Sequence, residues 1–376
     1  MRVLILSCNT GEGHNSCGRA IQSSFAERGV SCDMEDAFRF ISPAASRLVT
    51  TAFTGVYRHL PGIFRFGYRY AENHPGVFDQ LSATYKLLAT GTERLFCFLA
   101  DGGYDAVICP HVFSALMLTE VLRRHPICVA TYFVATDYTC SPSCGQSRLD
   151  LYFIPHESLS GEFVSGGVPA EKLSASGIPV RAQFDAALDR AAAKARIGLR
   201  PEEKHLLIMC GSMGCGPIRR LVRQIARQLP ENGRVSVICG TNQRLKKSLE
   251  RAHADDSRIH MYGYVQDISA MMDSADLYLT KPGGISVTEA ARKRLPMVFV
   301  NAVAGCETYN LDFYCRQGAA VTADTPEALA KLAVELLEDD AALARMSAAF
   351  APEAERSAAE YICRTVLAGA QEQESA

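Results

Sequence analysis

Several absences in the sequence narrow the class of protein before any motif is considered. No apolar run approaches the roughly 20 residues that a helix needs to span a bilayer. The apolar stretch at residues 3–6 is too short to be a secretory segment. The formal net charge is only −2, so the chain as a whole has no attraction for nucleic acid. We therefore expect a cytoplasmic protein that meets a membrane, if at all, from its surface.

The fourteen cysteines also lack the context of a disulfide framework. Without a secretory segment they are expected to remain reduced thiols. Cys140 and Cys144 have a loose metal-ligand spacing, but no second pair of cysteines or histidines follows at the distance that a zinc site needs. No Asp-x-Asp motif for a divalent ion is present. We predict no metal and no resident cofactor.

Short apolar strands alternate with helices along the whole chain, a pattern that predicts the α/β class. The 376 residues suit two domains. Each half opens with a strand, a glycine loop and a helix, as Rossmann-like domains do. We place the domains at residues 1–180 and 181–376, with a hinge near Gly177 and Pro179, and expect them to face a cleft.

The stretch Leu279–Asn310 is typical of a nucleotide site, because a strand, a glycine turn, a helix, a second strand and a polar loop follow one another. Gly283 and Gly284 let backbone amides come close to a ligand. A helix is expected from Ile285 to Lys293, and its amide end favours an anion. Glu289 lies just over one turn into it, where a carboxylate could bind a ribose diol. The alternative is an ordinary strand–helix corner with Glu289 on a solvated face.

Two further glycine loops follow strands. Residues 211–214 (Gly-Ser-Met-Gly) precede a helix and form a good phosphate cradle, although such loops also occur as tight turns. Residues 11–15 (Gly-Glu-Gly-His-Asn) follow the first strand but lack the third glycine of a dinucleotide fingerprint and the lysine of a Walker loop. His14 should lie at the carboxyl end of the sheet, where open α/β folds bind ligands. Alternatively, it only caps the helix or braces the loop.

Together these motifs closely resemble a known family. KPGG…S-x-x-E-A, followed by LPMVFVNAVAG-x-E-x-x-N, is similar to the donor-site signature of the GT-B glycosyltransferases that include the monogalactosyl- and glucosyl-diacylglycerol synthases. The lipid-linked N-acetylglucosamine transferase of peptidoglycan synthesis is a more distant relative. Gly-x-Gly-His after the first strand is an N-terminal hallmark of the same group, and the resemblance runs from Leu4 to Val321. In such proteins the last helix often crosses back onto the first domain.

The resemblance implies inverting transfer of a hexose from UDP-glucose or UDP-galactose, a co-substrate, to diacylglycerol or another lipid. His14 would be the base that takes the acceptor proton, since neutral imidazole titrates near working pH. Asp137 would assist it or bind the acceptor, although a strand-end aspartate needs no function. Glu289 would hold the ribose, and Glu307 and Asn310 would approach the sugar. The predicted donor-site residues are Gly211, Ser212, Met213, Gly214, Tyr264, Val265, Gly283, Gly284, Ile285, Glu289, Glu307 and Asn310, and the acceptor loop contributes Gly11, Gly13 and Asn15.

Two positions depart from the family pattern. Cys306 stands where the family usually has glutamine, and a thiol cannot replace an amide's paired donor and acceptor. After Asp137, residues 141–144 (Ser-Pro-Ser-Cys) stand where relatives commonly have a His-Pro pair. Which hexose is used, which lipid accepts it and how many sugars are added are therefore left open.

Residues 37–71 contain no Asp or Glu but several arginines interleaved with aromatic residues. This mixture suits an anionic membrane surface, and together with the family resemblance it predicts a protein bound peripherally to the inner face of the cell membrane. Single-stranded nucleic acid could use the same mixture, and the aromatic residues could simply be the core of amphipathic helices. The predicted membrane residues are Arg47, Arg58, Phe64, Arg65, Phe66 and Arg69.

Two other functions stay open. A UDP-N-acetylglucosamine-using transferase or epimerase would share the architecture, but an epimerase acts on a soluble sugar and gives no reason for the acid-free segment. A membrane-attached UDP-sugar sensor without turnover is the other alternative, and it is suggested by Cys306 and by the altered loop after Asp137.

Overall fold

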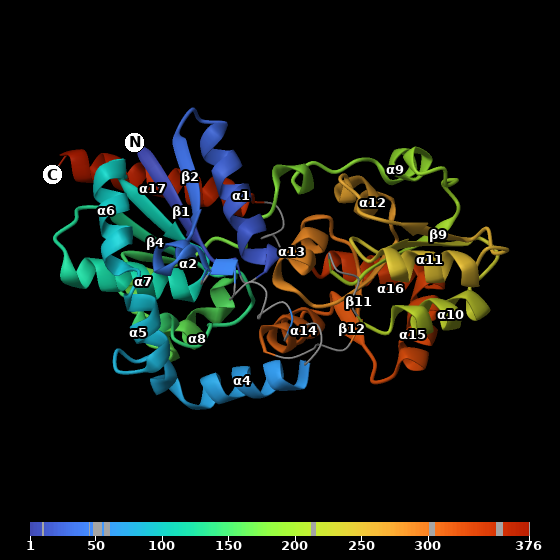
Figure 1. Ribbon diagram of the computed structural model, residues 1–376. Coiled ribbons are helices and arrows are strands. Elements are labelled where there is room, and N and C mark those ends of the chain that lie inside the picture. The colour runs from blue at the N-terminus through green and yellow to red at the C-terminus, as the bar shows by residue number, and fades with distance from the viewer. Residues whose placement is uncertain are drawn as a thin grey trace. The chain divides into compact units, whose positions relative to one another are not determined.

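The computed structural model describes residues 1–9, 11–44, 46–47, 55, 61–211, 216–300, 305–350 and 356–375. The chain divides into two compact units (Figure 1). The first contains Met1–Ala182, Ala304–Cys306 and Arg356–Ala376, and the second contains Gln183–Val303 and Glu307–Glu355. Each unit is a parallel sheet covered by helices, which confirms the α/β class.

The described strands of the first unit form a parallel sheet in the order β2-β1-β3-β4-β5-β6. Its central strands are continuous apolar runs because both faces of a parallel sheet are covered. Every residue of β3 is buried, and so is β1 after Arg2. The strands are β1 Arg2–Ser7, β2 Ser31–Asp36, β3 Ala106–Cys109, β4 Ala130–Val134, β5 Leu151–Ile154 and β6 Leu173–Ala175.

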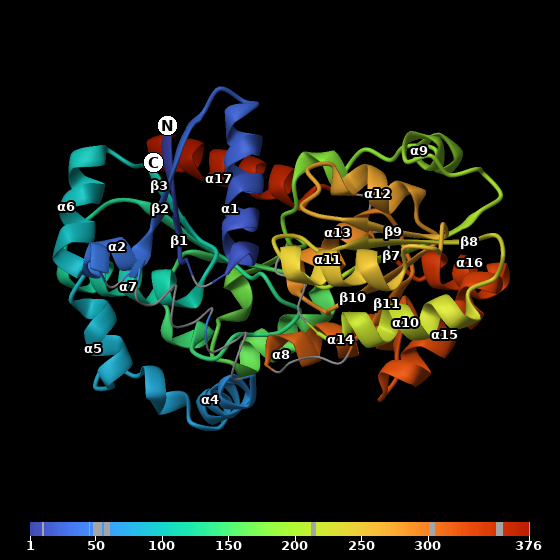
Figure 2. The same ribbon diagram turned by 45° about the vertical axis from the view of Figure 1, so that its right-hand side comes forward.

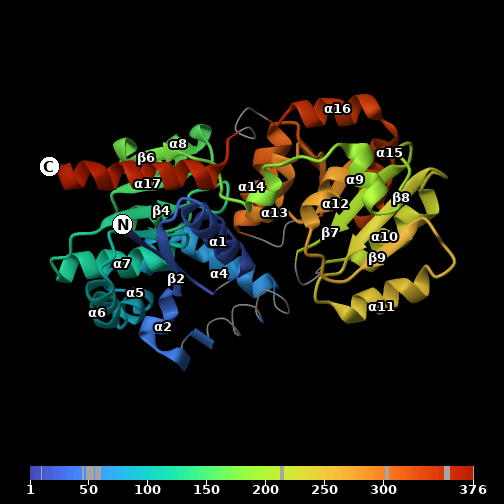
Figure 3. The ribbon, with the colours of Figure 1, turned by 90° about the horizontal axis from the view of Figure 1, so that it is seen from above.

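The helices of the first unit include the last one of the chain, α17. It lies beside α1 (Figures 1 and 3). An ion pair of 2.9 Å joins Arg28 to Glu360, and Ile362 and Val366 are fully buried. The helices are α1 Glu12–Ala26, α2 Ala37–Ile41, α4 Pro61–Asn73, α5 Ala83–Ala89, α6 Thr92–Gly102, α7 Val112–Arg124, α8 Ser160–Ser165 and α17 Ala358–Ser375, with the short 3₁₀ turn η1 Pro75–Phe78 before α5.

The second unit has a parallel sheet in the order β12-β11-β10-β7-β8-β9. Its strands are β7 Lys204–Met209, β8 Gly233–Ile238, β9 Ile259–Tyr262, β10 Leu277–Thr280, β11 Met297–Phe299 and β12 Ala320–Thr322. Its helices are α9 Arg190–Arg196, α10 Ile218–Gln228, α11 Gln243–Ala252, α12 Ile268–Ser274, α13 Gly284–Arg292, α14 Cys306–Arg316, α15 Pro326–Glu338 and α16 Asp340–Ala348.

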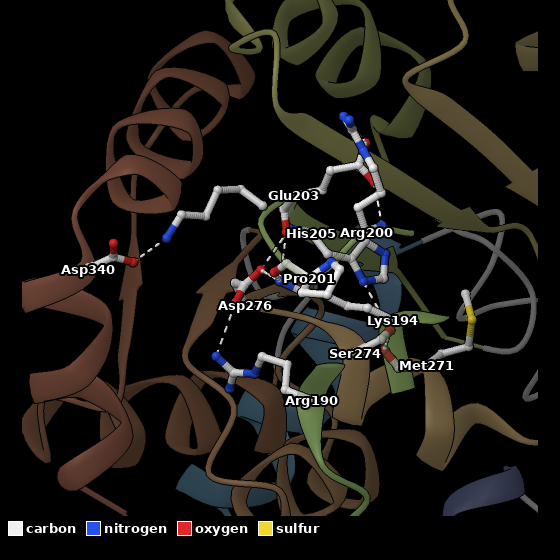
Figure 4. A network of polar contacts seen from close by, with 11 residues as sticks. Arg190, Lys194, Arg200, Pro201, Glu203, His205, Met271, Ser274, Asp276 and Asp340 are labelled. Atoms are coloured by element: carbon white, nitrogen blue, oxygen red, sulfur yellow. Dashed lines mark hydrogen bonds and ion pairs between the residues drawn. The ribbon is translucent and has the colours of Figure 1, made fainter. Parts of the chain in front are cut away.

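A buried polar network around Asp276 anchors α9 to the amino-terminal edge of this sheet (Figure 4). The Asp276 carboxylate accepts from Lys194 Nζ at 2.9 Å and from the backbone N–H of His205 at 2.8 Å, and it pairs with Arg190 at 3.0 Å. Lys194 and Asp276 are only 3% and 6% exposed. Such a pair stabilises the unit only while both partners are present, because a lone buried charge is costly.

The strand order places one ligand edge in each unit. In the first, β2 lies on one side of β1 and the later strands run outward from β3 on the other. In the second, the chain runs outward from β7 to β9 and then, on the other side, from β10 to β12. Open α/β sheets bind ligands beyond the carboxyl ends of the strands where the order reverses. The expected sites therefore follow β1 and β3 in the first unit, and β7 and β10 in the second.

Candidate active site

His14 lies in the first turn of α1, directly after the carboxyl end of β1. Its Nδ1 is 2.9 Å from the carbonyl oxygen of Pro110, which follows β3. The same nitrogen is 2.9 Å from Oγ1 of Thr136, which follows β4. The structure thus places the imidazole at the reversal point of the first sheet, held by the ends of two neighbouring strands.

These contacts define the tautomer of His14. A carbonyl oxygen can only accept a hydrogen bond, so Nδ1 carries the proton and Nε2 keeps its lone pair. Burial lowers the pKa of His14 from its ordinary value of 6.5 to about 4, outweighing the opposite effect of the bond to Pro110. The half-buried ring is therefore neutral near pH 7. A neutral imidazole with a lone pair on Nε2 can take a proton from a hydroxyl group.

A second imidazole, His111, packs edge-to-face against His14, with ring centroids 4.5 Å apart. His111 is the N-cap of α7, and its Nδ1 accepts from the backbone N–H of Phe113 at 3.0 Å. Burial and then the neighbouring His14 lower its pKa well below the ordinary value. No role for His111 was predicted from the sequence. The only signal in the sequence was that His111 comes shortly after a strand. This position indicates a site residue only because β3 lies beside β1, which brings His111 next to His14.

A chain of hydrogen bonds braces the loop before α1. Asn15 donates to Asn9 Oδ1 at 2.8 Å and accepts from Ser7 Oγ at 2.8 Å, and Asn9 Nδ2 donates to Asp36 at 3.1 Å. The bonds join the carboxyl ends of β1 and β2 to the first turn of α1. In this structure Asn15, predicted in the acceptor loop, maintains the shape of that loop.

Gly11 and Gly13 flank the start of α1. Gly11 is its N-cap, with an extended φ of 175° that any residue can adopt. A Cβ atom added at Gly11 would meet nothing within 4 Å, so the space above it is open. The glycine is thus explained by access to the first amides of α1 and not by backbone strain.

Asp137 follows Thr136 and is half-buried. The Thr136 hydroxyl contacts His14, and assistance by Asp137 remains a prediction. The loop that contains residues 141–144, which depart from the family pattern, packs tightly on α8 and the residues that follow it. Cys140 N donates to Glu162 Oε1 at 2.6 Å, and a Cβ atom added at Gly145 would overlap the carbonyl oxygen of Gly166.

In the second unit, residues 281–283 connect β10 to α13 at the reversal point of the sheet. Gly283 is the N-cap of α13, which begins at Gly284, one residue before the predicted start at Ile285. A Cβ atom on Gly283 would meet nothing within 4 Å, and neither glycine has a positive φ. The glycines leave the amide end of a nine-residue helix accessible, as an anion site requires.

Glu307 and Asn310 on α14 are tied to this loop. Glu307 Oε1 is 3.1 Å from Lys281 Nζ, and the two side chains are 7% and 8% exposed. Asn310 Nδ2 donates to the carbonyl oxygen of Pro282 at 2.9 Å. Asn310 is fully buried, so this contact holds the loop, and its approach to the sugar remains a prediction. Lys281 belongs to the predicted motif, but its pairing with Glu307 was not predicted from the sequence.

Glu289 is only 6% exposed, which excludes the alternative in which it lies on a solvated face. Its charge adds to the effect of burial in raising the pKa of Tyr278, so the two side chains are close. A carboxylate held in the protein interior beside the glycine loop suits a ligand role better than a surface role. Binding of a ribose by Glu289 remains a prediction.

Of the other predicted donor residues, Gly211, Tyr264 and Val265 follow strands of the same sheet at their carboxyl ends. Gly211, after β7, has a φ of +74°, a conformation that favours glycine. Ser212, Met213 and Gly214 lie outside the described residues. Tyr264 and Val265 follow β9, and Tyr264 is 69% exposed.

In the segment of arginine and aromatic residues (residues 37–71), some aromatic side chains are buried and others are exposed. Phe38 and Phe40 on α2 are core residues, 4% and 7% exposed. On α4, by contrast, Ile63, Phe66 and Tyr70 are 59%, 74% and 47% exposed. Their spacing of three and four residues puts them on one side of the helix.

α4 extends beyond α5 at one end of the first unit (Figures 1 and 2). Arg47 and Arg69 are exposed, the side chains of Phe64 and Arg65 are not described, and Arg58 lies outside the described residues. In the part of the chain that the structure describes, no helix is long and apolar enough to cross a membrane. No cluster of three His, Cys, Asp or Glu side chains that could hold a metal occurs there either.

Comparison with known proteins matches both units to glycosyltransferases. The family model for monogalactosyldiacylglycerol (MGDG) synthase matches residues 14–180, and that for the glycosyltransferase family 28 C-terminal domain matches residues 205–362. A processive diacylglycerol beta-glucosyltransferase of Bacillus mycoides is 28% identical over 98% of this chain and 93% of its own length. One from Bacillus cereus is 29% identical over 93% of this chain and 88% of its own length.

Solved structures with low sequence identity share the fold. MurG of Acinetobacter baumannii has a TM-score of 0.65 and 15% identity, over 97% of this chain and 99% of that one. The spinosyn rhamnosyltransferase SpnG has a TM-score of 0.63 and 12% identity, over 97% of this chain and 100% of that one. UDP-GlcNAc 2-epimerase of Neisseria meningitidis has a TM-score of 0.60 and 12% identity, over 98% of this chain and 100% of that one.

Proposed function

Because this chain belongs to the GT-B glycosyltransferase family that includes the MGDG synthases and the processive diacylglycerol glucosyltransferases, we propose that it transfers a hexose from a UDP-sugar to diacylglycerol. The observation that carries the proposal is the state of His14, neutral and with its lone pair on Nε2 at a ligand edge. UDP-glucose and UDP-galactose are the donors proposed.

The reaction is a single displacement that inverts the anomeric carbon. The acceptor oxygen forms a bond to that carbon while the bond to the UDP oxygen breaks, and the acceptor proton passes to Nε2 of His14. A base with a pKa of about 4 is weak. The proton therefore moves late, when the attacking oxygen has become acidic by bonding to the sugar. The leaving diphosphate gains charge, which the amide ends of α10 and α13 would stabilise.

The donor residues keep their predicted roles in this proposal. Glu289 binds the ribose and Glu307, oriented by Lys281, faces the sugar. No bound group beyond the co-substrate is proposed.

The lipid acceptor requires the protein to reach a bilayer. Ile63, Phe66 and Tyr70 expose an apolar side of α4, and Arg69 is exposed on the same helix. Aromatic and apolar side chains lodge at headgroup depth, and arginines suit anionic lipid. We therefore propose peripheral binding at the inner face of the cell membrane. An epimerase acting on a soluble sugar would have no use for this surface.

The test is release of UDP from UDP-glucose, UDP-galactose and UDP-N-acetylglucosamine, each with and without diacylglycerol vesicles. His14→Ala is compared with His260→Ala, a change at an exposed histidine on β9. Turnover should need the vesicles and fall by about 10²- to 10⁴-fold in His14→Ala alone. UDP binding without turnover of any donor would reject the transferase and favour the sensor. Conversion of UDP-N-acetylglucosamine to its epimer without vesicles and without release of UDP would favour the epimerase.

A further inference from the structure

The second unit carries a basic surface that the proposed reaction does not use. Residues 218–251 contain nine Lys or Arg and only two Glu, whereas the net charge of the whole chain is −2. Most of these cations lie on α10 and α11, which precede and follow β8 in the chain. Such a local excess of positive charge in a nearly neutral chain suits an anionic partner.

The two helices face solvent on the same side of the sheet. α10 connects β7 to β8 and α11 connects β8 to β9, and right-handed crossovers in one direction put both on one face. Their apolar sides enter a single core cluster, to which α10 contributes Leu221 and Ile225 and α11 contributes Leu245 and Leu249. The opposite sides of both helices are therefore exposed together.

The exposed sides form two basic stripes. We define the basic face as Arg219, Arg223 and Arg227 on α10 with Arg244, Lys247 and Arg251 on α11, all of them exposed. Their spacings of three and four residues line each set along one side of its helix. The three α11 cations border one shallow depression, together with Ser248.

Neighbouring carboxylates do not neutralise this face. Arg220 and Lys246 take the nearby acids, with ion pairs of 2.5 Å to Glu327 and to Glu250. Among the residues that the structure describes, none of the six cations of the basic face forms an ion pair with a carboxylate. Their charge therefore remains available to a partner.

The UDP-sugar cannot account for the whole face. Arg219 and Arg244 lie near the starts of their helices, at the donor edge of the sheet. Arg227 is two turns further along α10, roughly 12 Å away at 1.5 Å per residue, and Arg251 lies at the far end of α11. The stripes thus extend well beyond the reach of one diphosphate.

We propose that the basic face is an electrostatic docking surface for an anionic lipid bilayer. The choice of a bilayer rests on the proposed function, since the acceptor is a membrane lipid. Neither α10 nor α11 contains an aromatic residue, so the face lacks the stacking platforms with which single-stranded nucleic acid is bound. Cations without aromatic or apolar neighbours can attract the headgroup phosphates of a bilayer without inserting side chains into it. This contact is separate from the apolar side of α4.

The test measures partitioning of the full chain onto vesicles of phosphatidylcholine with or without phosphatidylglycerol. The variant Arg223→Gln/Arg227→Gln/Arg251→Gln is compared with Arg196→Gln/Arg345→Gln/Arg364→Gln, which removes the same charge from exposed sites on α9, α16 and α17. At about fivefold per basic residue, the first variant should bind anionic vesicles on the order of 100-fold more weakly than wild type. The second should bind them nearly as wild type does.

Salt and lipid composition give independent readouts. Wild-type binding to anionic vesicles should fall when the Debye length is cut from about 30 Å to about 3 Å. Binding of both variants to vesicles of phosphatidylcholine alone should match wild type. Equal binding of the two variants to anionic vesicles, or tighter binding of wild type to a single-stranded oligonucleotide than to those vesicles, would overturn the proposal.

A separate assay distinguishes this proposal from the proposed function. UDP release with diacylglycerol in neutral detergent micelles does not need the basic face, so both variants should turn over at the wild-type rate. If wild type releases no UDP in any lipid but the vesicle results hold, the transferase fails and the docking surface stands. If turnover is present but the two variants bind vesicles alike, only the docking surface fails.

Discussion

The pH dependence of turnover tests the assigned state of His14 directly. With an ordinary pKa of 6.5, an imidazole base would be about 9% neutral at pH 5.5. Burial lowers the pKa of His14 to about 4, which leaves it about 97% neutral at the same pH. The rate at pH 5.5 should therefore stay close to the rate at pH 7 and not drop about tenfold.

The assay is kcat/KM for UDP release between pH 4 and pH 8, which reports ionisations of the free enzyme. Donor sugar diphosphates do not titrate in this interval, so an acid limb belongs to the protein. His111 packs against His14 and its pKa is also lowered, so neither ring is expected to give an acid limb near pH 6.5. An acid limb centred at 6.5 or above would refute the reasoning.

Thr136→Val serves as the control variant. It removes the hydroxyl 2.9 Å from Nδ1 while keeping the side-chain shape and the bond to Pro110. The tautomer should therefore survive, with a modest loss of rate through looser orientation of the ring and an acid limb that remains well below 6.5. A variant with normal turnover but an acid limb shifted up to 6.5 would show that the hydroxyl, and not burial, lowers the pKa of His14.

Three further predictions concern contacts elsewhere in the chain. Asp276→Asn leaves the buried Lys194 without a carboxylate and should lower the free energy of unfolding of the second unit by about 3–5 kcal/mol, measured by hydrogen exchange at β7 and β10. The control is Asp340→Asn, because Asp340 is a 78% exposed partner of Lys204, and it should lower that free energy by less than about 1 kcal/mol. Glu307→Gln should abolish donor turnover and destabilise the loop at Lys281, and the double variant Glu307→Gln/Lys281→Met should recover melting temperature without recovering turnover. Gly145→Ala forces a Cβ atom into the backbone of Gly166 and should cost about 1–3 kcal/mol, while Gly161→Ala, where the space is open, should be neutral or stabilising in thermal unfolding.

The fold class was predictable because parallel strands have a local signal. The run Val3–Leu6 is apolar at every position, β10 is buried at every position, and glycine loops with helices follow both. The order of the strands has no such signal, since equally apolar parallel strands can exchange places without changing their own burial. His111 was missed for this reason. Its contact with His14 depends on β3 lying beside β1, a fact that no window of sequence contains.

Buried charges were equally hidden. Lys194 lies in an alanine-rich, charged segment, a pattern typical of a solvated helix. It is nevertheless 3% exposed and paired with Asp276, which is 82 residues further along the chain and directly precedes β10. Lys281 was visible in its motif, but its partner Glu307 follows a complete helix and strand later. Pairs of this kind are made by tertiary structure alone, so residue type and periodicity could indicate the site but not the ion pairs that hold it.

The Arg/aromatic segment shows where periodicity reaches its limit. Phe38 and Phe40 become core residues because α2 follows β2 directly and packs against α6 and α7, where their rings meet Phe113 and Phe98 at 6.1 Å and 5.2 Å. Phe66 and Tyr70 have a similar helical spacing, but α4 packs chiefly on η1 and leaves them exposed. An amphipathic pattern predicts that one side of a helix is apolar. It does not predict whether another element of the fold packs against that side. The core interpretation of the segment is therefore confirmed for α2, whereas membrane binding by the exposed side of α4 remains a prediction.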